Sequence, residues 1–112
     1  MKVLDAKSGM ILIPSENKYT KRKGFFALAS ETVENFSNKK NEEINIAYVQ
    51  WGDNSKIIPS QLMGIYMGYE YSDFWLSGVK KHHMILIDGI LCKINGYEFR
   101  YIEPVIQAEK NA

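Results

Sequence analysis

The chain has 112 residues and a formal net charge of +1, with 14 Lys and Arg against 13 Asp and Glu. Hydrophobic residues make up 46% of the chain and aromatic residues 12%, which is enough to fill one core and excludes a disordered tail. No charge of either sign dominates the chain, so composition favours neither a nucleic-acid-binding nor a membrane-surface protein.

The N-terminal residues and the single cysteine bear on the compartment. The first apolar run is broken by Asp5, Lys7 and Ser8, which fits neither a signal peptide nor a transmembrane helix. Cys92 is the only cysteine, which excludes an intrachain disulfide and a zinc cage of thiolates. We therefore expect one cytoplasmic domain, residues 1–112, with no membrane partner.

Short strand-like runs separated by turn residues fill most of the chain. Gly64 and Gly68 interrupt one run, as in a strand that bends or bulges. Asp88-Gly89 and Asn95-Gly96 suit two-residue hairpin turns, which need positive φ at both central positions. Strands are expected at Met10–Ile13, Ile44–Trp51, Leu62–Tyr71, Phe74–Leu76, His83–Ile87, Ile90–Ile94 and Tyr97–Ile102. The pattern predicts an all-β, mainly antiparallel fold, a small β-barrel or sandwich.

Residues 16–43 are the exception, because they show no period-2 pattern. Phe25, Ala29, Val33 and Phe36 follow one another at offsets of four, four and three, which would place them on one face of a helix. The alternative is a long mobile loop between two strands, and loops of that length are usually functional or disordered. We expect a β-barrel with one long loop or short helix near residues 18–40.

If this segment is a loop, it carries an apolar anchor for a protein partner. The anchor residues are Gly24, Phe25, Phe26, Ala27 and Leu28. Gly24 would act as the hinge, and the preceding Lys21, Arg22 and Lys23 would keep the anchor soluble. A weak contact of this kind becomes useful when several copies of it act together.

This order of segments resembles the GroES-type co-chaperonins (chaperonin-10), in the manner of a divergent, phage-like member. KVLDAKSGMILIP resembles the opening strand of that family, and GFFAL stands where the family carries its Gly-plus-apolar loop anchor. The strand that leads out of the family's loop is resembled by INIAYVQWGDN, and the next strand by IIPSQLMGIYMGYEY. The closing hairpin and last strand are resembled by DFWLSGVKKHHMILIDGILCKI.

The resemblance implies a subunit of a seven-membered ring that caps a chaperonin through its loops and assists protein folding. It also implies that no chemistry takes place on the chain itself. Residues 95–112 extend past the end that the family leads one to expect.

The residues that could carry chemistry do not form a recognisable catalytic pattern. His82 and His83 are adjacent on an expected strand and would point to opposite faces, as a solvated strand end rather than one metal site. Cys92 lies in an apolar run and is interpreted as a small core residue. No phosphate loop, nucleophile elbow or zinc spacing occurs. We therefore expect no enzyme, no cofactor and no metal.

Aromatic residues crowd one segment of the chain: Tyr66, Tyr69, Tyr71, Phe74 and Trp75. They are either the barrel core and its rim or a platform for a partner. Platforms for single-stranded nucleic acid normally carry interleaved Lys or Arg, and MGIYMGYEYSDFWLSG contains none. Nucleic acid is therefore not an expected partner.

Three function classes remain from the sequence. The first is a co-chaperonin-like ring subunit, a homo-oligomer that binds a chaperonin or another protein. The second is a β-barrel structural or connector protein of a phage or mobile element, in which residues 24–37 form a helix on the barrel. The third is a small partner-binding inhibitor.

Overall fold

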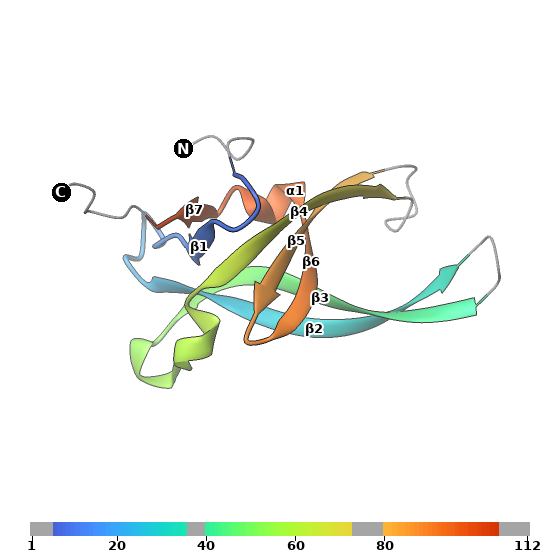
Figure 1. Cartoon of the computed structure of the whole chain (residues 1–112). Helices are drawn as coiled ribbons and strands as arrows, with labels where there is room; N and C mark the ends of the chain where they lie inside the picture. The colour runs from blue at the N-terminus through green and yellow to red at the C-terminus, as the bar shows by residue number, and fades with distance from the viewer. Residues whose placement is uncertain (1–5, 36–39, 73–79, 106–112) are drawn as a thin grey trace.

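The computed structural model describes residues 6–35, 40–72 and 80–105 (Figure 1). The elements in these ranges are β1 (Ile11–Pro14), β2 (Lys23–Asn35), β3 (Lys40–Gly52), η2 (Asn54–Lys56), η3 (Pro59–Gln61), β4 (Gly64–Ser72), β5 (Lys80–Ile87), β6 (Ile90–Asn95), α1 (Gly96–Phe99) and β7 (Ile102–Pro104). Strands thus make up most of the described chain, as the sequence predicts.

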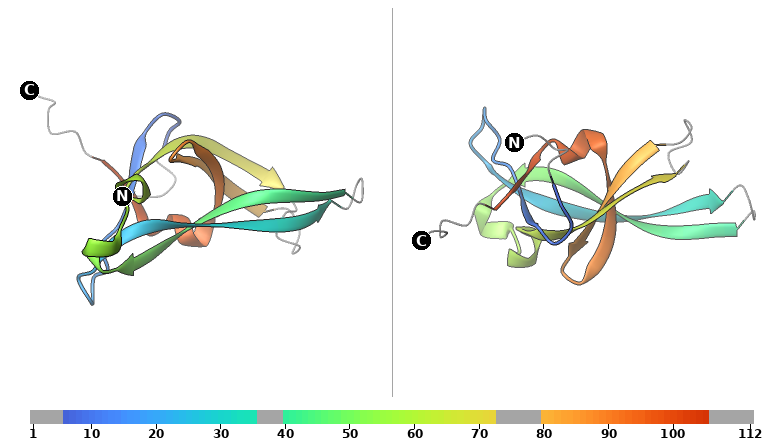
Figure 2. Two further views of the ribbon diagram at one scale, coloured as in Figure 1. Left: turned by 90° about the horizontal axis from the view of Figure 1, so that it is seen from below. Right: turned by 45° about the horizontal axis from the view of Figure 1, so that its top comes forward.

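The strands form one seven-stranded sheet in the order β2-β3-β6-β5-β4-β1-β7. Neighbouring strands are antiparallel, except that β3 and β6 are parallel where Ile46 lies beside Lys93. The sheet curls strongly and closes part of the way around a barrel (Figure 2). The predicted all-β, barrel-like fold is confirmed.

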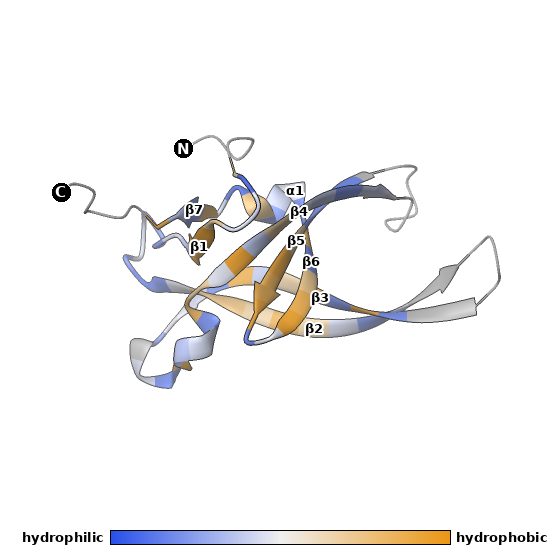
Figure 3. Ribbon diagram, viewed as in Figure 1, coloured by the Kyte–Doolittle hydropathy of each residue, from blue (hydrophilic) through white to orange (hydrophobic). Residues whose placement is uncertain are grey.

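The core lies on the inner side of this curled sheet. Figure 3 shows hydrophobic residues where β2 and β3 pass β5 and β6, whereas hydrophilic residues follow along the β2–β3 hairpin toward its far end. The buried cluster consists of Leu12, Phe26, Ala47, Val49, Tyr66, Ile85, Ile87, Cys92, Ile94, Phe99 and Ile102. Every strand from β1 to β7 contributes to it, so the core depends on the whole sheet.

The structure places a strand where the sequence predicted a long loop or a short helix near residues 18–40. All 13 residues of β2 pair with β3, from Lys23 beside Gly52 to Asn35 beside Lys40. This ladder satisfies the backbone hydrogen bonds that a helix would otherwise make. The run GFFALA is apolar at every position, because both faces of β2 are partly covered there. The residues at helical spacing therefore share no helix face, and residues 36–39 lie outside the described chain.

Two of the predicted turn features are confirmed. Asp88 and Gly89 both have positive φ, 54° and 76°, and join β5 to β6 in a tight hairpin. In β4, the pairing with β5 shifts register between Tyr66 and Gly68, and Gly68 has a φ of 107°. Met67 is the extra residue of this bulge, so β4 bends where its glycine suggested it would.

The predicted hairpin at Asn95-Gly96 and the predicted strand Tyr97–Ile102 are wrong. Asn95 has a φ of −78°, and its Oδ1 accepts a hydrogen bond of 2.8 Å from the Glu98 backbone N–H. It therefore caps the one-turn helix α1, which buries Phe99. The chain then returns as β7 beside β1. Part of the expected C-terminal extension thus completes the sheet, whereas residues 106–112 lie outside the described chain.

Candidate functional site

The residues predicted as a mobile anchor lie in β2. Phe26 pairs with Val49 of β3 and is fully buried. Ala27 is buried and Phe25 is half-buried, whereas Leu28 leaves 37% of its surface exposed. Phe26 cannot reach a partner without leaving the core. This segment is therefore a strand paired with β3, with one partly exposed leucine, rather than the mobile loop that the sequence suggested, and partner binding through it stays a prediction.

Gly24 has a structural use different from the predicted hinge. A Cβ atom at this position would lie 2.3 Å from the Ser15 carbonyl oxygen and 3.2 Å from Nε1 of Trp51. The absence of a side chain lets β2 pass directly beneath the loop between β1 and β2. Gly24 therefore belongs to a tight contact between two backbone segments.

The two histidines are both buried, which corrects the expectation of a solvated strand end. His83 stacks on Phe99 with ring centroids 3.8 Å apart, and its Nδ1 lies 2.7 Å from the Tyr66 hydroxyl. Burial lowers the pKa of His83 to about 4, with smaller effects from Lys81 and His82. His83 is therefore neutral at neutral pH and acts as a core residue that is hydrogen-bonded to Tyr66.

His82 lies on the opposite face of β5, with Nε2 3.6 Å from a Glu70 carboxylate oxygen. Burial lowers the pKa of His82 as well. Burial also raises the pKa of Cys92 to about 11, so this side chain is a thiol at neutral pH. Within residues 6–35, 40–72 and 80–105, no three His, Cys, Asp or Glu side chains gather as metal ligands would.

The aromatic segment of β4 divides between the core and the surface. Tyr66 belongs to the core, whereas Tyr69 and Tyr71 are 54% and 62% exposed. These two rings meet edge to face at 5.7 Å, and the Lys81 ammonium lies 4.2 Å from the centre of the Tyr69 ring. Phe74 and Trp75 lie outside the described residues.

A row of aliphatic side chains crosses the outer face of the sheet. Ile11 lies beside Ile65, Ile65 beside Leu86, and Leu86 beside Leu91. Val105, directly after β7, extends the row, since its N–H donates to the Ile11 carbonyl at 2.9 Å. These five residues, here called the outer row, thus follow β7, β1, β4, β5 and β6 across the sheet.

The outer row is substantially exposed. Ile11, Val105, Ile65 and Leu91 leave 37%, 39%, 40% and 46% of their surfaces accessible, and Leu86 is half-buried. The exposed Met67 of the bulge lies next to Ile65 on β4. A contiguous apolar patch of this kind on a small domain marks a contact surface more often than single scattered residues do.

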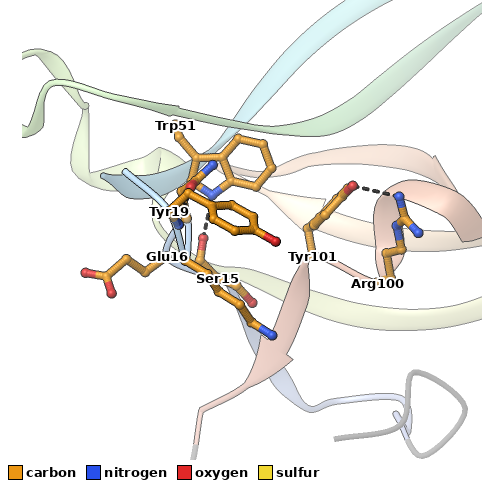
Figure 4. Close-up of a pocket in the computed structure, with 8 residues that line it drawn as sticks. Ser15, Glu16, Tyr19, Trp51, Arg100 and Tyr101 are labelled. Carbon is orange, nitrogen blue, oxygen red and sulfur yellow. Dashed lines mark hydrogen bonds between the residues drawn. The ribbon is translucent and has the colours of Figure 1, made fainter. Parts of the chain in front are cut away.

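An open pocket of about 520 Å³ lies between the β1–β2 loop and the segment after α1 (Figure 4). It is lined by residues 15–19, Trp51, Arg100 and Tyr101. Trp51 and Tyr101 meet edge to face with centroids 5.2 Å apart, and Tyr97 meets Tyr101 at 6.1 Å. The pocket wall is therefore aromatic.

The wall is held in place by hydrogen bonds to the loop. Trp51 Nε1 donates to the Ser15 carbonyl at 2.8 Å, and the Ser15 N–H donates to the Tyr101 carbonyl at 2.7 Å. Arg100 donates to the Tyr101 hydroxyl at 2.7 Å and lies 3.9 Å from the centre of the Tyr97 ring. The pocket thus joins an aromatic wall to cationic groups.

Neither the outer row nor the pocket was predicted from the sequence. The residues of the pocket lie up to 86 positions apart, from Ser15 to Tyr101. The outer row depends on strand register, which the sequence does not give directly. One sequence signal pointed to the outer row. MILI and ILC are apolar at consecutive positions, which places apolar side chains on both faces of β5 and β6 and indicates that both faces are buried.

No family model, no curated protein and no solved structure matches the chain. Among the residues that the structure describes, no helix has the length and apolar character needed to cross a membrane.

Proposed function

We propose that this chain is a structural, non-enzymatic subunit that assembles with copies of itself through the outer row. The observation that carries the proposal is the alignment of five aliphatic side chains, four on neighbouring strands and Val105 directly after β7. Four of the five are more than one-third exposed. Covering such a patch removes apolar surface from water and stabilises the associated state.

The size of the outer row suits a protein contact. Four steps of about 4.8 Å between strands make it roughly 19 Å long. A row of this length can form the centre of an interface that buries about 800 Å² on each partner. Its exposed aliphatic side chains are rigid and lie on strands, so little conformational entropy is lost when they are covered.

The lack of charge in the outer row suits a second copy of the chain as the occupant. None of its five residues is charged, so an identical row can cover it without burying an unpaired charge. The net charge of +1 adds little repulsion between copies.

This proposal retains the connector-type structural protein predicted from the sequence, but not its helix on the barrel. The resemblance to co-chaperonins also implies self-assembly, and that function stays a prediction. It would need a partner-binding element other than buried Phe26, so we place the structural subunit first.

The test compares two lysine substitutions by sedimentation velocity. Leu91→Lys places a charge in the outer row and is expected to leave a monomer of 12.9 kDa. Ile58→Lys is the matched control, because Ile58 is 59% exposed and lies in the connection between η2 and η3. The control is expected to assemble as the wild type does. Equal behaviour of both variants would contradict the proposal.

A further inference from the structure

The pocket beside Trp51 combines flat aromatic surfaces with a local excess of positive charge. Tyr19 leaves 94% of its surface exposed, so its ring is open to stacking. Tyr19 lines the same pocket as Trp51 and Tyr101, and Figure 4 draws these three side chains around it. A flat ligand could therefore contact Tyr19 and the pocket wall together.

Cationic side chains line this pocket and a second hollow formed by the same loop. Lys18 and Arg100 line the pocket itself, and Lys21, Arg22 and Lys23 line a neighbouring hollow along the same loop. The carboxylates that line the two hollows are those of Glu16 and Asp53. Five cations against two carboxylates favour an anionic ligand.

Asp53 keeps its negative charge in the second hollow. Its carboxylate accepts hydrogen bonds from the Ser55 N–H and hydroxyl, at 3.0 and 2.9 Å. These bonds lower the pKa of Asp53, and Arg22 lowers it further. The carboxylate therefore stays ionised near Arg22, and Glu16 is the acidic residue that lines the aromatic pocket.

Hydrogen bonds within the chain fix the conformation of the loop that carries Lys18 and Tyr19 without a ligand. Asn17 Oδ1 accepts hydrogen bonds from the Tyr19 and Thr20 N–H groups at 2.8 and 2.9 Å. The Asn17 N–H donates to the Arg22 carbonyl, and Lys21 turns the chain with a φ of 62°. Because the loop is already ordered, binding costs less conformational entropy than it would on a mobile loop.

We propose that this pocket binds single-stranded nucleic acid. One base stacks on Tyr19 against the wall formed by Trp51 and Tyr101, and the adjoining phosphates lie along Lys18 and Arg22. Aromatic stacking combined with a basic path for the backbone is the general chemistry of single-strand binding. The site lies apart from the outer row, so it is independent of the proposed self-assembly.

The geometry favours single strands over two other ligands. A duplex keeps its bases stacked on one another, which leaves no free base face for Tyr19. A proline-rich peptide also docks on aromatic grooves, but it brings no negative charge for the five cations. The sequence-based expectation against nucleic acid had two grounds. The Tyr66–Trp75 segment has no basic residues, and the basic residues from Lys18 to Lys23 are followed closely in the chain by acidic ones: Glu31, Glu34, Glu42 and Glu43.

Fluorescence anisotropy of the full chain with a labelled oligothymidylate of about 12 nucleotides tests the proposal. Tyr19→Ala is expected to weaken binding at least fivefold, because it removes one stacking face. Tyr71→Ala is the matched control, since Tyr71 is an exposed tyrosine on β4 that does not line the pocket. It is expected to bind as the wild type does.

The salt dependence of the oligonucleotide affinity gives a second measurement, and a loss of folding would not reproduce its expected change. Lys18→Ala is expected to reduce the slope of log affinity against log salt by about 0.7, the value for one phosphate contact on a single strand. Lys7→Ala, at another exposed lysine, is expected to leave the slope unchanged.

Four results would overturn the proposal. The first is no binding at protein concentrations of about 100 µM in low salt, the weak limit of non-specific nucleic-acid binding. The second is an equal loss in Tyr19→Ala and Tyr71→Ala. The third is equal affinity for AMP or for a duplex of the same length. The fourth is binding of a proline-rich peptide but not of the oligonucleotide.

Discussion

Two neighbouring rows of apolar side chains cross the same three strands and meet opposite environments. The inner row joins Tyr66, Ile85 and Cys92, which are 3%, 0% and 0% exposed. One position along each strand, Ile65 and Leu91 belong to the outer row and are 40% and 46% exposed. Both rows consist of apolar side chains, and the face of the sheet decides which row is buried.

This difference separates residues that hold the fold from residues available to a partner. The curled sheet covers its inner face with β2, β3 and α1, whereas no described element covers the outer row. Substitutions on the inner face should therefore change the free energy of unfolding, and substitutions in the outer row should change association.

The largest effect is expected at Phe26, which β2 buries in the core although the sequence also allowed a mobile loop there. Phe26→Glu buries a charge and should destabilise the chain by several kcal/mol, so that it no longer folds cooperatively. Leu28→Glu, at a position 37% exposed, should cost much less. Urea denaturation followed by circular dichroism measures both. A stable, native-like Phe26→Glu variant would restore the loop interpretation.

Truncations of the inner and outer rows sharpen the comparison directly. Ile85→Ala should destabilise the chain by about 2–5 kcal/mol, because it leaves a cavity in a fully packed site. Leu91→Ala, measured at a concentration where the chain is monomeric, should cost less than about 1 kcal/mol. Similar losses in the two variants would mean that the outer row is core and not surface.

The pH dependence of stability tests the burial of His83. Burial lowers the pKa of His83 to about 4, against 6.5 for an ordinary histidine. Between these values the unfolded chain binds a proton that the folded chain does not. Stability is therefore full above about pH 6.5 and should fall by up to about 3 kcal/mol as the pH drops toward 4.

Urea midpoints collected from neutral to acidic pH measure this loss. His82, whose pKa burial also lowers, contributes in the same direction. In His83→Phe, the number of protons taken up on unfolding should fall by up to one, so the unfolding free energy should depend less steeply on pH. If the pH dependence of stability is unchanged in His83→Phe, a group other than His83 causes the loss of stability at acidic pH.

The smallest effect is expected at Asn95, whose side chain caps α1. Asn95→Ala removes its hydrogen bond to the Glu98 N–H and should destabilise the chain by about 1 kcal/mol. Asn95→Asp keeps the acceptor and should cost a few tenths of that amount at most. Thermal denaturation of the two variants measures the difference. Equal midpoints for Asn95→Ala and Asn95→Asp would mean that the cap does not stabilise the chain.

Local chemistry predicted the parts of the fold that depend on few residues. Asp88-Gly89 forms the expected hairpin because both residues adopt positive φ, and Gly68 forms the expected bulge. Asn95-Gly96 presented the same signal and became a helix cap instead. There, the burial of Phe99 and a hydrogen bond from the Val49 N–H to the Glu98 carboxylate favour α1.

The segment from Lys23 to Asn35 could not be assigned from local patterns. Its apolar residues fit a helical spacing by position, but pairing with β3 and the fully buried Phe26 set the strand. The pocket and the outer row are likewise products of register and of contacts between distant segments. Such surfaces follow from the folded chain and not from any short motif in it.

Light scattering of the wild-type chain over a dilution series tests the central claim, that the outer row joins copies of the chain. The account predicts a solution mass at tens of micromolar that is a multiple of 12.9 kDa and that falls toward 12.9 kDa on dilution. A mass of 12.9 kDa at every concentration would contradict it.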